Sequence, residues 1–465
     1  MADALVVGNN LAALVAAAEL GTAGRDVVLV TDGRPPGGHF RGLRIAGTDF
    51  DIGMVTLERF PAGGTAGEPD LAGYDPDRRY DWTRFAGAVD RWQLAHADLR
   101  RAATPEVLVE GRRWPDHLMS DRLDVLAELG TPPPAVLPRA EPVHAAHKTT
   151  GPAYETLTYA AAAEANHGRA LQERLVIPFA AKVLGPGLDD LLARYHRAAW
   201  LPLYWPETVT AACAGEPTAV AEHPFWTTSS GFVGDLVREL ERRIAELPTV
   251  TVDPSAVVSL SRAEGGWEVR TESGGRTVHP RPVLGIAAER AAALLGLPPV
   301  GRTPGAPVTV LFGTVRAAAV HRPAACLLVA DPGLVAYRVT DQDLMAGRDA
   351  EWRRVTVEAG HAADAAGRDG DVAGPLVDEL CGLLGIDPHR GGSGGHPDVR
   401  VLRTLRAPGA LGIPTAASVA AARQDRHALL EACPGAVLTG ALLGPGLNSL
   451  GDQVVQGLAA AARLG

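Results

Sequence analysis

The chain has 465 residues, a length that predicts two or three domains rather than one small core. Hydrophobic residues make up 46% of it and charged residues 21%, which is typical of a globular chain with a large buried interior. With 44 basic and 54 acidic residues, the net charge of −10 argues against nucleic acid or an anionic membrane as the main partner. The four cysteines are far apart and form no C-x-x-C pair, which excludes a disulfide scaffold and a structural zinc site.

The start of the chain has the pattern of a strand, a turn, a helix and a second strand. Residues 4–7 are a short apolar run of the kind that is buried on both faces of a parallel sheet, and residues 8–10 form the turn. An alanine-rich stretch at 11–20 predicts a helix, and residues 26–30 predict the second strand. This order makes a right-handed βαβ unit. It predicts the opening of a dinucleotide-binding domain, in which a pyrophosphate lies against N–H groups at the start of the helix.

The glycine fingerprint of such a domain is incomplete in this chain. In G-x-G-x-x-G register its three positions are Gly8, Asn10 and Ala13. Asn10 departs from the pattern because a glycine there lets the backbone approach the phosphates, although asparagine enters left-handed backbone readily and can donate from its amide. The ribose-binding acid is expected near Thr31, which stands beside Asp32. A Rossmann-like unit that holds no nucleotide is the alternative interpretation of this segment.

Two further motifs follow the second strand. Gly37, Gly38 and His39 form a double glycine with a histidine, and residues 50–54 close a short alternating segment. At this point the sequence resembles the flavoprotein superfamily that includes UDP-galactopyranose mutase, protoporphyrinogen oxidase, carotenoid desaturases and amine oxidases. The resemblance implies that the opening unit holds the ADP part of FAD and that the double glycine lies beside the ribose and diphosphate. It also implies that residues 51–53 pass close to the isoalloxazine ring.

The end of the chain resembles the same superfamily. Residues 436–440 predict a buried strand, residues 444–448 a turn, and the residues from 452 onward a final alanine-rich helix. The run Asp-Gln-Val at 452–454 is most similar to the mutase form of the closing flavin motif, in which a helix N-terminus faces the flavin pyrimidine. An ordinary capped terminal helix is the alternative, but it leaves unexplained why both ends match one superfamily. The resemblance implies these cofactor-binding residues: Gly8, Asn9, Asn10, Leu11, Ala12, Thr31, Asp32, Gly37, Gly38, His39, Val257, Gly440, Asn448, Asp452, Gln453 and Val454.

The middle of the chain predicts further helices and strands. Residues 61–230 are rich in helix formers, and residues 304–400 contain strand patterns such as 307–312 and 354–358. Between these two regions, four segments fit a return to the first domain: a helix at 233–246 and strands at 249–260, 267–271 and 281–287, with a hairpin turn at Gly265 and Gly266.

These patterns predict an α/β fold in which a Rossmann-like FAD-binding domain is joined to a second, α+β substrate domain. The FAD-binding domain is expected to be discontinuous and to contain residues 1–60, 231–290 and 400–465. The substrate domain is expected to contain residues 61–230 and 291–399, with a helical part and a sheet.

Few polar or aromatic side chains are candidates for a pocket beside the ring. His39 is a candidate proton-transfer group because histidine titrates near neutral pH, with orientation of the backbone as the alternative. Arg403 is a candidate for binding a carboxylate or the flavin diphosphate bidentately, with a surface ion pair as the alternative. Aromatic residues between prolines are more typical of hinge or core packing than of a pocket. The candidate pocket residues are His39, Met54, Tyr204, Trp205, Trp226 and Arg403, and no single catalytic residue is assigned.

Three functions are compatible with these features. The first is an FAD-dependent oxidoreductase acting on a small metabolite in bacterial secondary metabolism. The second is a non-redox flavoenzyme similar to UDP-galactopyranose mutase, although residues 199–208 lack the arginine with which mutases grip the substrate diphosphate. The third is a flavin-free binding or scaffold relative, which Asn10 and Thr31 favour. Typical amine oxidation is disfavoured because no lysine follows Lys182, whereas amine oxidases carry one in the C-terminal half.

The expected ligands are therefore FAD and a small-molecule substrate, with no metal. No nucleic-acid partner is expected, and a homodimer is left open. The chain begins without a basic leader and has no apolar run of about 18 residues, so we expect a cytoplasmic protein with no integral membrane segment.

Overall fold

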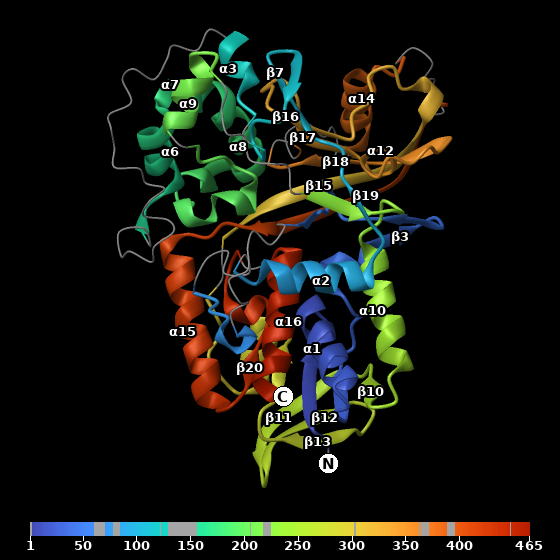
Figure 1. The fold of residues 1–465 in the computed structure, drawn as a ribbon, viewed down its shortest axis with the longest axis vertical. Coiled ribbons are helices and arrows are strands. Elements are labelled where there is room, and N and C mark those ends of the chain that lie inside the picture. The colour runs from blue at the N-terminus through green and yellow to red at the C-terminus, as the bar shows by residue number, and fades with distance from the viewer. Residues whose placement is uncertain are drawn as a thin grey trace.

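The computed structural model shows an α/β protein with several sheets, which confirms the predicted fold class at this level. The N- and C-termini lie at the same end of the molecule (Figure 1). No helix in the described part of the chain is both long and apolar enough to cross a bilayer. The structure describes residues 2–59, 70–77, 84–120, 122–128, 156–204, 206–216, 225–301, 304–361, 363, 372–387, 396–446 and 448–465.

Five parallel strands form the sheet that contains the start of the chain. In spatial order they are β10 (Val250–Asp253), β2 (Val27–Val30), β1 (Ala4–Gly8), β14 (Val283–Gly285) and β20 (Val437–Leu438). The central strand β1 is buried along its whole length, as a strand covered on both faces must be. Gly8 and Gly285 are register partners, so the carboxyl ends of β1 and β14 lie next to each other.

Three helices pack against this sheet, and the first of them also packs against the other two (Figure 1): α1 (Leu11–Thr22), α10 (Gly234–Glu246) and α16 (Leu450–Leu464). The first and last helices approach closely because α16 has Gly457 at the crossing, where a Cβ would clash with Val15 of α1. On α10, Leu236 and Leu240 are fully buried at helical spacing. Chain ends that are far apart in sequence thus share one core.

Residues 257–279 form a three-stranded antiparallel sheet, whose first strand begins later than the sequence predicts. The prediction of one strand at 249–260 is wrong, because the chain turns between β10 and β11 (Val257–Ala263). Pro254 has no N–H for a ladder, and Asp253 accepts a hydrogen bond from Ser255 N at 2.9 Å, which closes a local turn. The predicted hairpin at 265–266 is confirmed, since β11 pairs with β12 (Gly266–Thr271), which pairs in turn with β13 (Arg276–His279).

A seven-stranded sheet occupies the other half of the molecule (Figure 1). Its inner strands present apolar side chains such as Val339, Val355 and Val357 to α14 (Ala373–Leu384), and these form one hydrophobic cluster. The opposite face of the same strands carries polar residues. In spatial order the strands are β19 (Val399–Gly412), β15 (Gly305–Arg316), β18 (Trp352–Ala359), β17 (Ala336–Asp341), β16 (Cys326–Val329), β7 (Glu106–Val109) and β8 (Arg112–Pro115).

The remaining elements that the structure describes are further helices and two small sheets. Two small antiparallel sheets are formed by β3 (Leu43–Ile45) with β4 (Thr48–Phe50), and by β5 (Leu57–Glu58), β9 (Phe225–Thr228) and β6 (Leu99–Arg101). The other α-helices are α2 (Ala86–His96), α3 (Asp124–Glu128), α6 (Tyr159–His167), α7 (Arg169–Leu171), α8 (Ile177–Leu184), α9 (Pro206–Cys213), α11 (Ala288–Leu294), α12 (Gln342–Met345) and α15 (Ala416–Ala432). One π-helical turn spans Gln172–Val176, and 3-10 turns span Gly38–Arg41, Leu71–Gly73, Gly185–Leu188, Ala193–Ala199, Ala317–Ala319 and Gly440–Leu443.

Candidate functional site

The parallel sheet has a topological switch point between β1 and β14. From β1 the chain adds β2 and then β10 on one side, whereas β14 and β20 lie on the other. In open parallel sheets, ligands bind outside the carboxyl ends of the strands at such a point. Here that region is bounded by Gly8, Asn10, Gly285 and Gly440, and we call it the switch-point crevice.

The side chain of Asn10 lies at the switch point, between α1 and β14. Asn10 is the N-cap of α1, and its Oδ1 accepts a hydrogen bond from Ala13 N at 2.8 Å. Its Nδ2 donates to the Gly285 carbonyl at 2.9 Å. A Cβ at Gly440 would clash with the same amide. The position that a dinucleotide fingerprint keeps empty with a glycine is therefore filled by a side chain that bridges α1 and β14.

The start of the closing helix contributes a second contact to α1. Gln453 is buried, and its Oε1 accepts a hydrogen bond from Ala12 N at 3.2 Å. Asp452 and Val454 are fully buried, and Asp452 forms a capping box with Ser449. Two of the N–H groups in the first turn of α1 thus already have acceptors within the chain.

The adenine end of the predicted groove is closed by an ion pair. Asp32 Oδ1 accepts a hydrogen bond from Val257 N at 2.8 Å, and Arg290 of α11 lies 3.4 Å from the Asp32 carboxylate. Arg290 also donates to the carbonyl of Val257. Thr31, the alternative ribose position, is buried. Both backbone groups of Val257, which the resemblance assigns to the adenine, are bonded to side chains of this chain.

The double glycine borders the exposed side of the crevice. Gly37 N donates to the Asn9 carbonyl at 2.6 Å, which ties the double glycine to the β1–α1 turn. Gly38 and His39 are exposed. Desolvation by the surrounding protein nevertheless lowers the pKa of His39 to about 4, so the imidazole is neutral at pH 7. Asn448, which the closing motif places near the flavin, is also exposed.

The segment that the resemblance places beside the ring is anchored by a buried carboxylate. Both oxygens of Asp51 accept hydrogen bonds from Val233 N, at 3.0 and 3.1 Å. Burial raises the pKa of Asp51 to about 7, while the backbone hydrogen bonds and Arg354 act in the opposite direction. Gly53 lies against Glu358 so closely that a Cβ there would clash with the carboxylate.

Two buried ion pairs lie on the polar side of β17, β18 and α12. Arg338 and Glu358 are 2% and 5% exposed and lie 2.5 Å apart, and the Tyr337 hydroxyl donates a hydrogen bond to the Glu358 carboxylate. The Arg338 guanidinium stacks on Trp200 at 4.0 Å. We call this set, together with the Asp343–Arg354 pair described next, the inner polar face.

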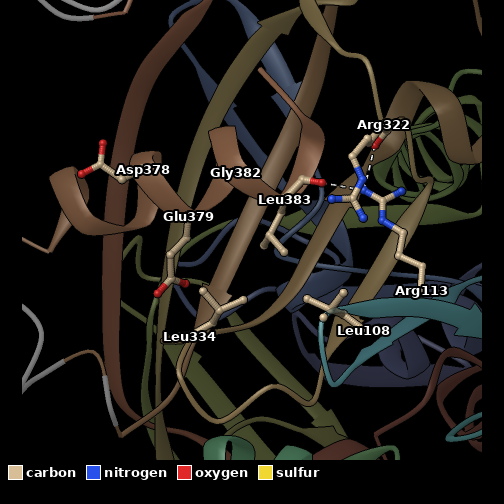
Figure 2. Close-up of a pocket in the computed structure, with 9 residues that line it drawn as sticks. Leu108, Arg113, Arg322, Leu334, Asp378, Glu379, Gly382 and Leu383 are labelled. Atoms are coloured by element: carbon tan, nitrogen blue, oxygen red, sulfur yellow. Dashed lines mark hydrogen bonds between the residues drawn. The ribbon is translucent and has the colours of Figure 1, made fainter. Parts of the chain in front are cut away.

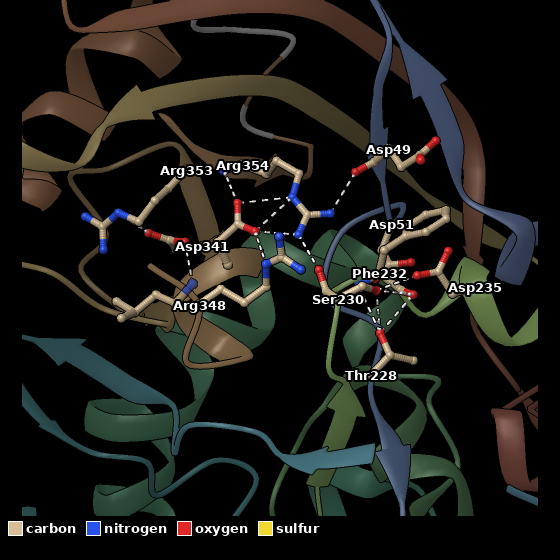
Figure 3. A network of polar contacts seen from close by, with 12 residues as sticks. Asp49, Asp51, Thr228, Ser230, Phe232, Asp235, Asp341, Arg348, Arg353 and Arg354 are labelled. Atoms are coloured by element: carbon tan, nitrogen blue, oxygen red, sulfur yellow. Dashed lines mark hydrogen bonds and ion pairs between the residues drawn. The ribbon is translucent and has the colours of Figure 1, made fainter. Parts of the chain in front are cut away.

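Figure 3 shows Arg354 beside the segment that contains Asp49 and Asp51. Its guanidinium pairs with Asp343 at 2.5 Å and donates to the Ser230 carbonyl at 2.6 Å and the Asp49 carbonyl at 3.1 Å. Sequence reasoning missed Arg338, Arg354 and Glu358. A signal was present, because Arg354 and Glu358 alternate with apolar residues in the predicted strand and therefore share a face.

The candidate pocket residues do not converge. Met54 lies in a buried cluster with its sulfur 3.4 Å from Cys326, and Tyr204 is buried and donates to the His117 carbonyl. Trp226 lies under the Arg59 guanidinium at 4.3 Å. Arg403 is exposed on β19, and Trp205 lies outside the described residues. At the carboxyl ends of the parallel strands, Asn10 and Gln453 instead bond to the first turn of α1, and Asp32 pairs with Arg290.

A cavity of about 450 Å³ lies elsewhere (Figure 2). Arg113 at its edge donates to the carbonyls of Arg322 and Leu383, at 2.8 and 2.6 Å. None of its lining residues belongs to the parallel sheet or to the turns at its carboxyl ends. They are Leu108, Gly111, Arg113, Arg322, Leu334, Asp378, Glu379, Gly382 and Leu383.

Comparison with known proteins gives a result for the fold and none for the sequence. No model of a known protein family matches the chain, and no curated protein matches it either. Among solved structures, a reduced UDP-galactopyranose mutase is similar with a TM-score of 0.66 and 12% identity over 99% of this chain and 92% of that one. A protein provisionally named protoporphyrinogen oxidase from Exiguobacterium sp. 255-15 gives 0.59 and 14% over 98% of both chains. Putrescine oxidase bound to putrescine gives 0.55 and 13% over 99% and 97%.

These likenesses extend over nearly the whole length of each chain. The similar structures are a mutase, a protoporphyrinogen oxidase and an amine oxidase, the same kinds of protein that the two ends of the sequence resemble. The predicted resemblance is therefore confirmed for the fold, which is similar to the folds of UDP-galactopyranose mutase, protoporphyrinogen oxidase and putrescine oxidase.

Proposed function

We propose that the chain is an FAD-dependent oxidoreductase that acts on a small molecule. Residues 1–60, 231–290 and 400–465 would form a Rossmann-like FAD-binding domain, and residues 61–230 and 291–399 the substrate domain. The observation that carries the proposal is the switch point of the parallel sheet, with a glycine turn, a double glycine and the start of the closing helix gathered around it. The structural likenesses support the same function, since the mutase and oxidase folds cover nearly the whole chain.

The residues around the crevice suit the parts of FAD in an order that follows the sheet. Asp32 and Val257 would meet the ribose and adenine, and the first turn of α1 with Gly38 would meet the diphosphate. The segment around Asp51 would lie beside the ring. Bound FAD supplies hydride or electron transfer, and the protein positions the substrate and excludes water.

Two features separate this chain from named branches of the superfamily. Lys182, the last lysine, is buried and donates to the carbonyls of Val329 and Ala336, so it serves the packing of the sheet. Arg338, the guanidinium that stacks on Trp200, is neutralised by Glu358. Lys182 therefore does not supply the flavin-side lysine of amine oxidases. Arg338 does not supply an arginine that could bind a sugar diphosphate. We propose a small metabolite of apolar or aromatic character as the substrate, in bacterial secondary metabolism.

A specific observation favours a second candidate function. The N–H of Ala12, the N–H and carbonyl of Val257 and the carboxylate of Asp32, which the resemblance assigns to the cofactor, already have partners within the chain. A relative that has lost the flavin and serves in binding would have this arrangement, because a groove without a ligand must satisfy its own donors and acceptors.

Absorbance of the purified full-length protein separates the two candidates. The oxidoreductase is expected to show the visible bands of flavin, either as purified or after addition of FAD, and to release FAD on heating. It is also expected to gain thermal stability with FAD, because a ligand that binds only the folded state raises the melting temperature. A folded protein that stays colourless and whose melting temperature ignores excess FAD would exclude the first candidate. Net electron transfer to an acceptor during turnover would exclude a mutase-like reaction.

A further inference from the structure

We propose that Asn10, Gln453 and Arg290 bond to the backbone groups that the dinucleotide would otherwise use, and that these three side chains set the affinity of the crevice for FAD. We call each of them a stand-in for the dinucleotide. This inference rests on the proposed function. It assigns the chain a weakly held, exchangeable cofactor in place of a permanently bound one.

The first step concerns the diphosphate end. A helix N-terminus attracts a phosphate because its first N–H groups have no partners within the helix. In this chain Ala13 N donates to Asn10 and Ala12 N donates to Gln453, so two of these donors are already used. Asn10 is held at its other end by the Gly285 carbonyl, which keeps the amide across the crevice. A diphosphate must break these contacts before it can reach the same donors.

The second step concerns the adenine end. Val257 offers one N–H and one carbonyl, and both are bonded, to Asp32 and Arg290 respectively. The Asp32 carboxylate is in turn paired with Arg290 at 3.4 Å. An adenine ribose that uses Val257 and Asp32 must therefore displace the Arg290 side chain, which is 39% exposed.

The third step is the balance of the exchange. Binding replaces each internal hydrogen bond by one to the ligand, so the net gain per contact is far smaller than at a groove whose donors are open. Three side chains, from α16, α11 and the β1–α1 turn, impose this exchange at the diphosphate and adenine ends of the proposed FAD site. Removing a stand-in should therefore raise the affinity for FAD, which is the opposite of what removing an ordinary binding residue does.

The test is a titration of FAD into the full-length wild type and three variants, with binding measured by calorimetry and by flavin fluorescence. The variants are Asn10→Gly, Asn10→Asp and Arg290→Ala. Wild type is expected to purify with less than one flavin per chain and to bind FAD with a micromolar or weaker dissociation constant. Asn10→Gly should bind about tenfold more tightly, the value of one freed hydrogen-bond donor, while the protein without FAD melts at a lower temperature. Asn10→Asp keeps the helix cap but places a negative charge at the diphosphate, so it should bind FAD more weakly.

ADP is the second probe, because it contains the adenine and diphosphate without the flavin. Arg290→Ala should tighten ADP and FAD alike, which keeps the inference testable if Asn10→Gly does not fold. A wild type that purifies with stoichiometric FAD, and loses affinity in Asn10→Gly and Arg290→Ala, would overturn the inference and leave the proposed function intact. Folded wild type and folded variants that all ignore FAD would overturn both.

Discussion

The switch-point crevice and the inner polar face are both polar regions inside an apolar framework, but they are built differently. At the crevice, neutral amides of Asn10 and Gln453 bond to backbone groups, and the Asp32–Arg290 pair is partly exposed. On the inner polar face, Arg338 and Glu358 are full charges in direct contact and almost completely buried.

The difference indicates which region can change on binding. A neutral hydrogen bond between a side chain and the backbone can be exchanged for one to a ligand at little cost, whereas separating a buried ion pair leaves an uncompensated charge. We therefore expect the crevice to adapt to a ligand and the inner polar face to hold the segment at Asp51–Gly53 in place.

Breaking the buried ion pair should have the largest effect. Arg338→Met leaves the Glu358 carboxylate buried without its partner, which typically destabilises a protein by about 3–5 kcal/mol. The free energy of unfolding from urea denaturation measures this loss. Arg338→Met combined with Glu358→Met should lose less, because no isolated charge remains.

Arg169→Gln is the matched control for the ion pair. Arg169 and Glu173 form a pair at 3.5 Å whose side chains are 75% and 61% exposed, so solvent screens it. Its removal should leave the unfolding midpoint nearly unchanged. Equal losses in Arg338→Met and Arg169→Gln would show that burial of Arg338 and Glu358 does not distinguish the inner polar face.

Gly53→Ala tests the contact between the inner polar face and the segment at Asp51–Gly53. The new Cβ would press on the Glu358 carboxylate while the backbone at Gly53 keeps a φ of 77°. Gly47→Ala is the control, since Gly47 has a φ of 82° and a Cβ added there would have no other atom within 4 Å. Both variants bear the strain of left-handed backbone, so the difference isolates the overpacking, about 1–3 kcal/mol.

Equal unfolding free energies for Gly53→Ala and Gly47→Ala would mean that the Glu358 carboxylate moves aside freely. The inner polar face would then be as adaptable as the crevice, and the contrast between the two regions would fail.

Asp51 should give the buried segment a characteristic pH dependence. Burial raises its pKa in the folded protein from 3.8 to about 7, so the folded state favours the protonated form more than the unfolded state does. The associated stability is complete below about pH 4 and is lost as the pH rises through about 7. Asp51→Asn removes this titration, so wild type should lose stability relative to the variant across that window. A difference that stays constant from pH 4 to pH 8 would contradict the burial of this carboxyl.

The sequence predicted the parts of the fold that depend on local pattern. Residues 4–7, the helix at 11–20 and the strand at 26–30 follow directly from apolar runs and a glycine turn, and all three elements are present. The separation of β10 from β11 was not predicted because it depends on Pro254 and on the Asp253–Ser255 turn, and these matter less in a hydropathy pattern than the apolar residues around them.

The candidate site could be predicted only in part. Asn10 and Asp32 were identified from their positions in the fingerprint, but their partners are Gly285 and Arg290, more than 200 residues away in the chain. Pairings over such separations depend on the assembled sheet and have no local signal. The same holds for Arg338 and Trp200, whose stacking depends on how a 3-10 turn meets β17.

His39 should give the smallest change in stability, with a pH dependence opposite in sign to that of Asp51. Desolvation lowers its pKa in the folded protein from 6.5 to about 4, so the unfolded chain takes up the proton first as the pH falls. Wild type should therefore lose stability relative to His39→Gln between about pH 6.5 and pH 4. Because His39 is exposed at the edge of the crevice, solvent screens the shift, and the loss should be smaller than that at Asp51. Excess FAD should enlarge the loss if the cofactor covers the imidazole, and a loss that is unchanged by FAD would place the ligand away from the double glycine.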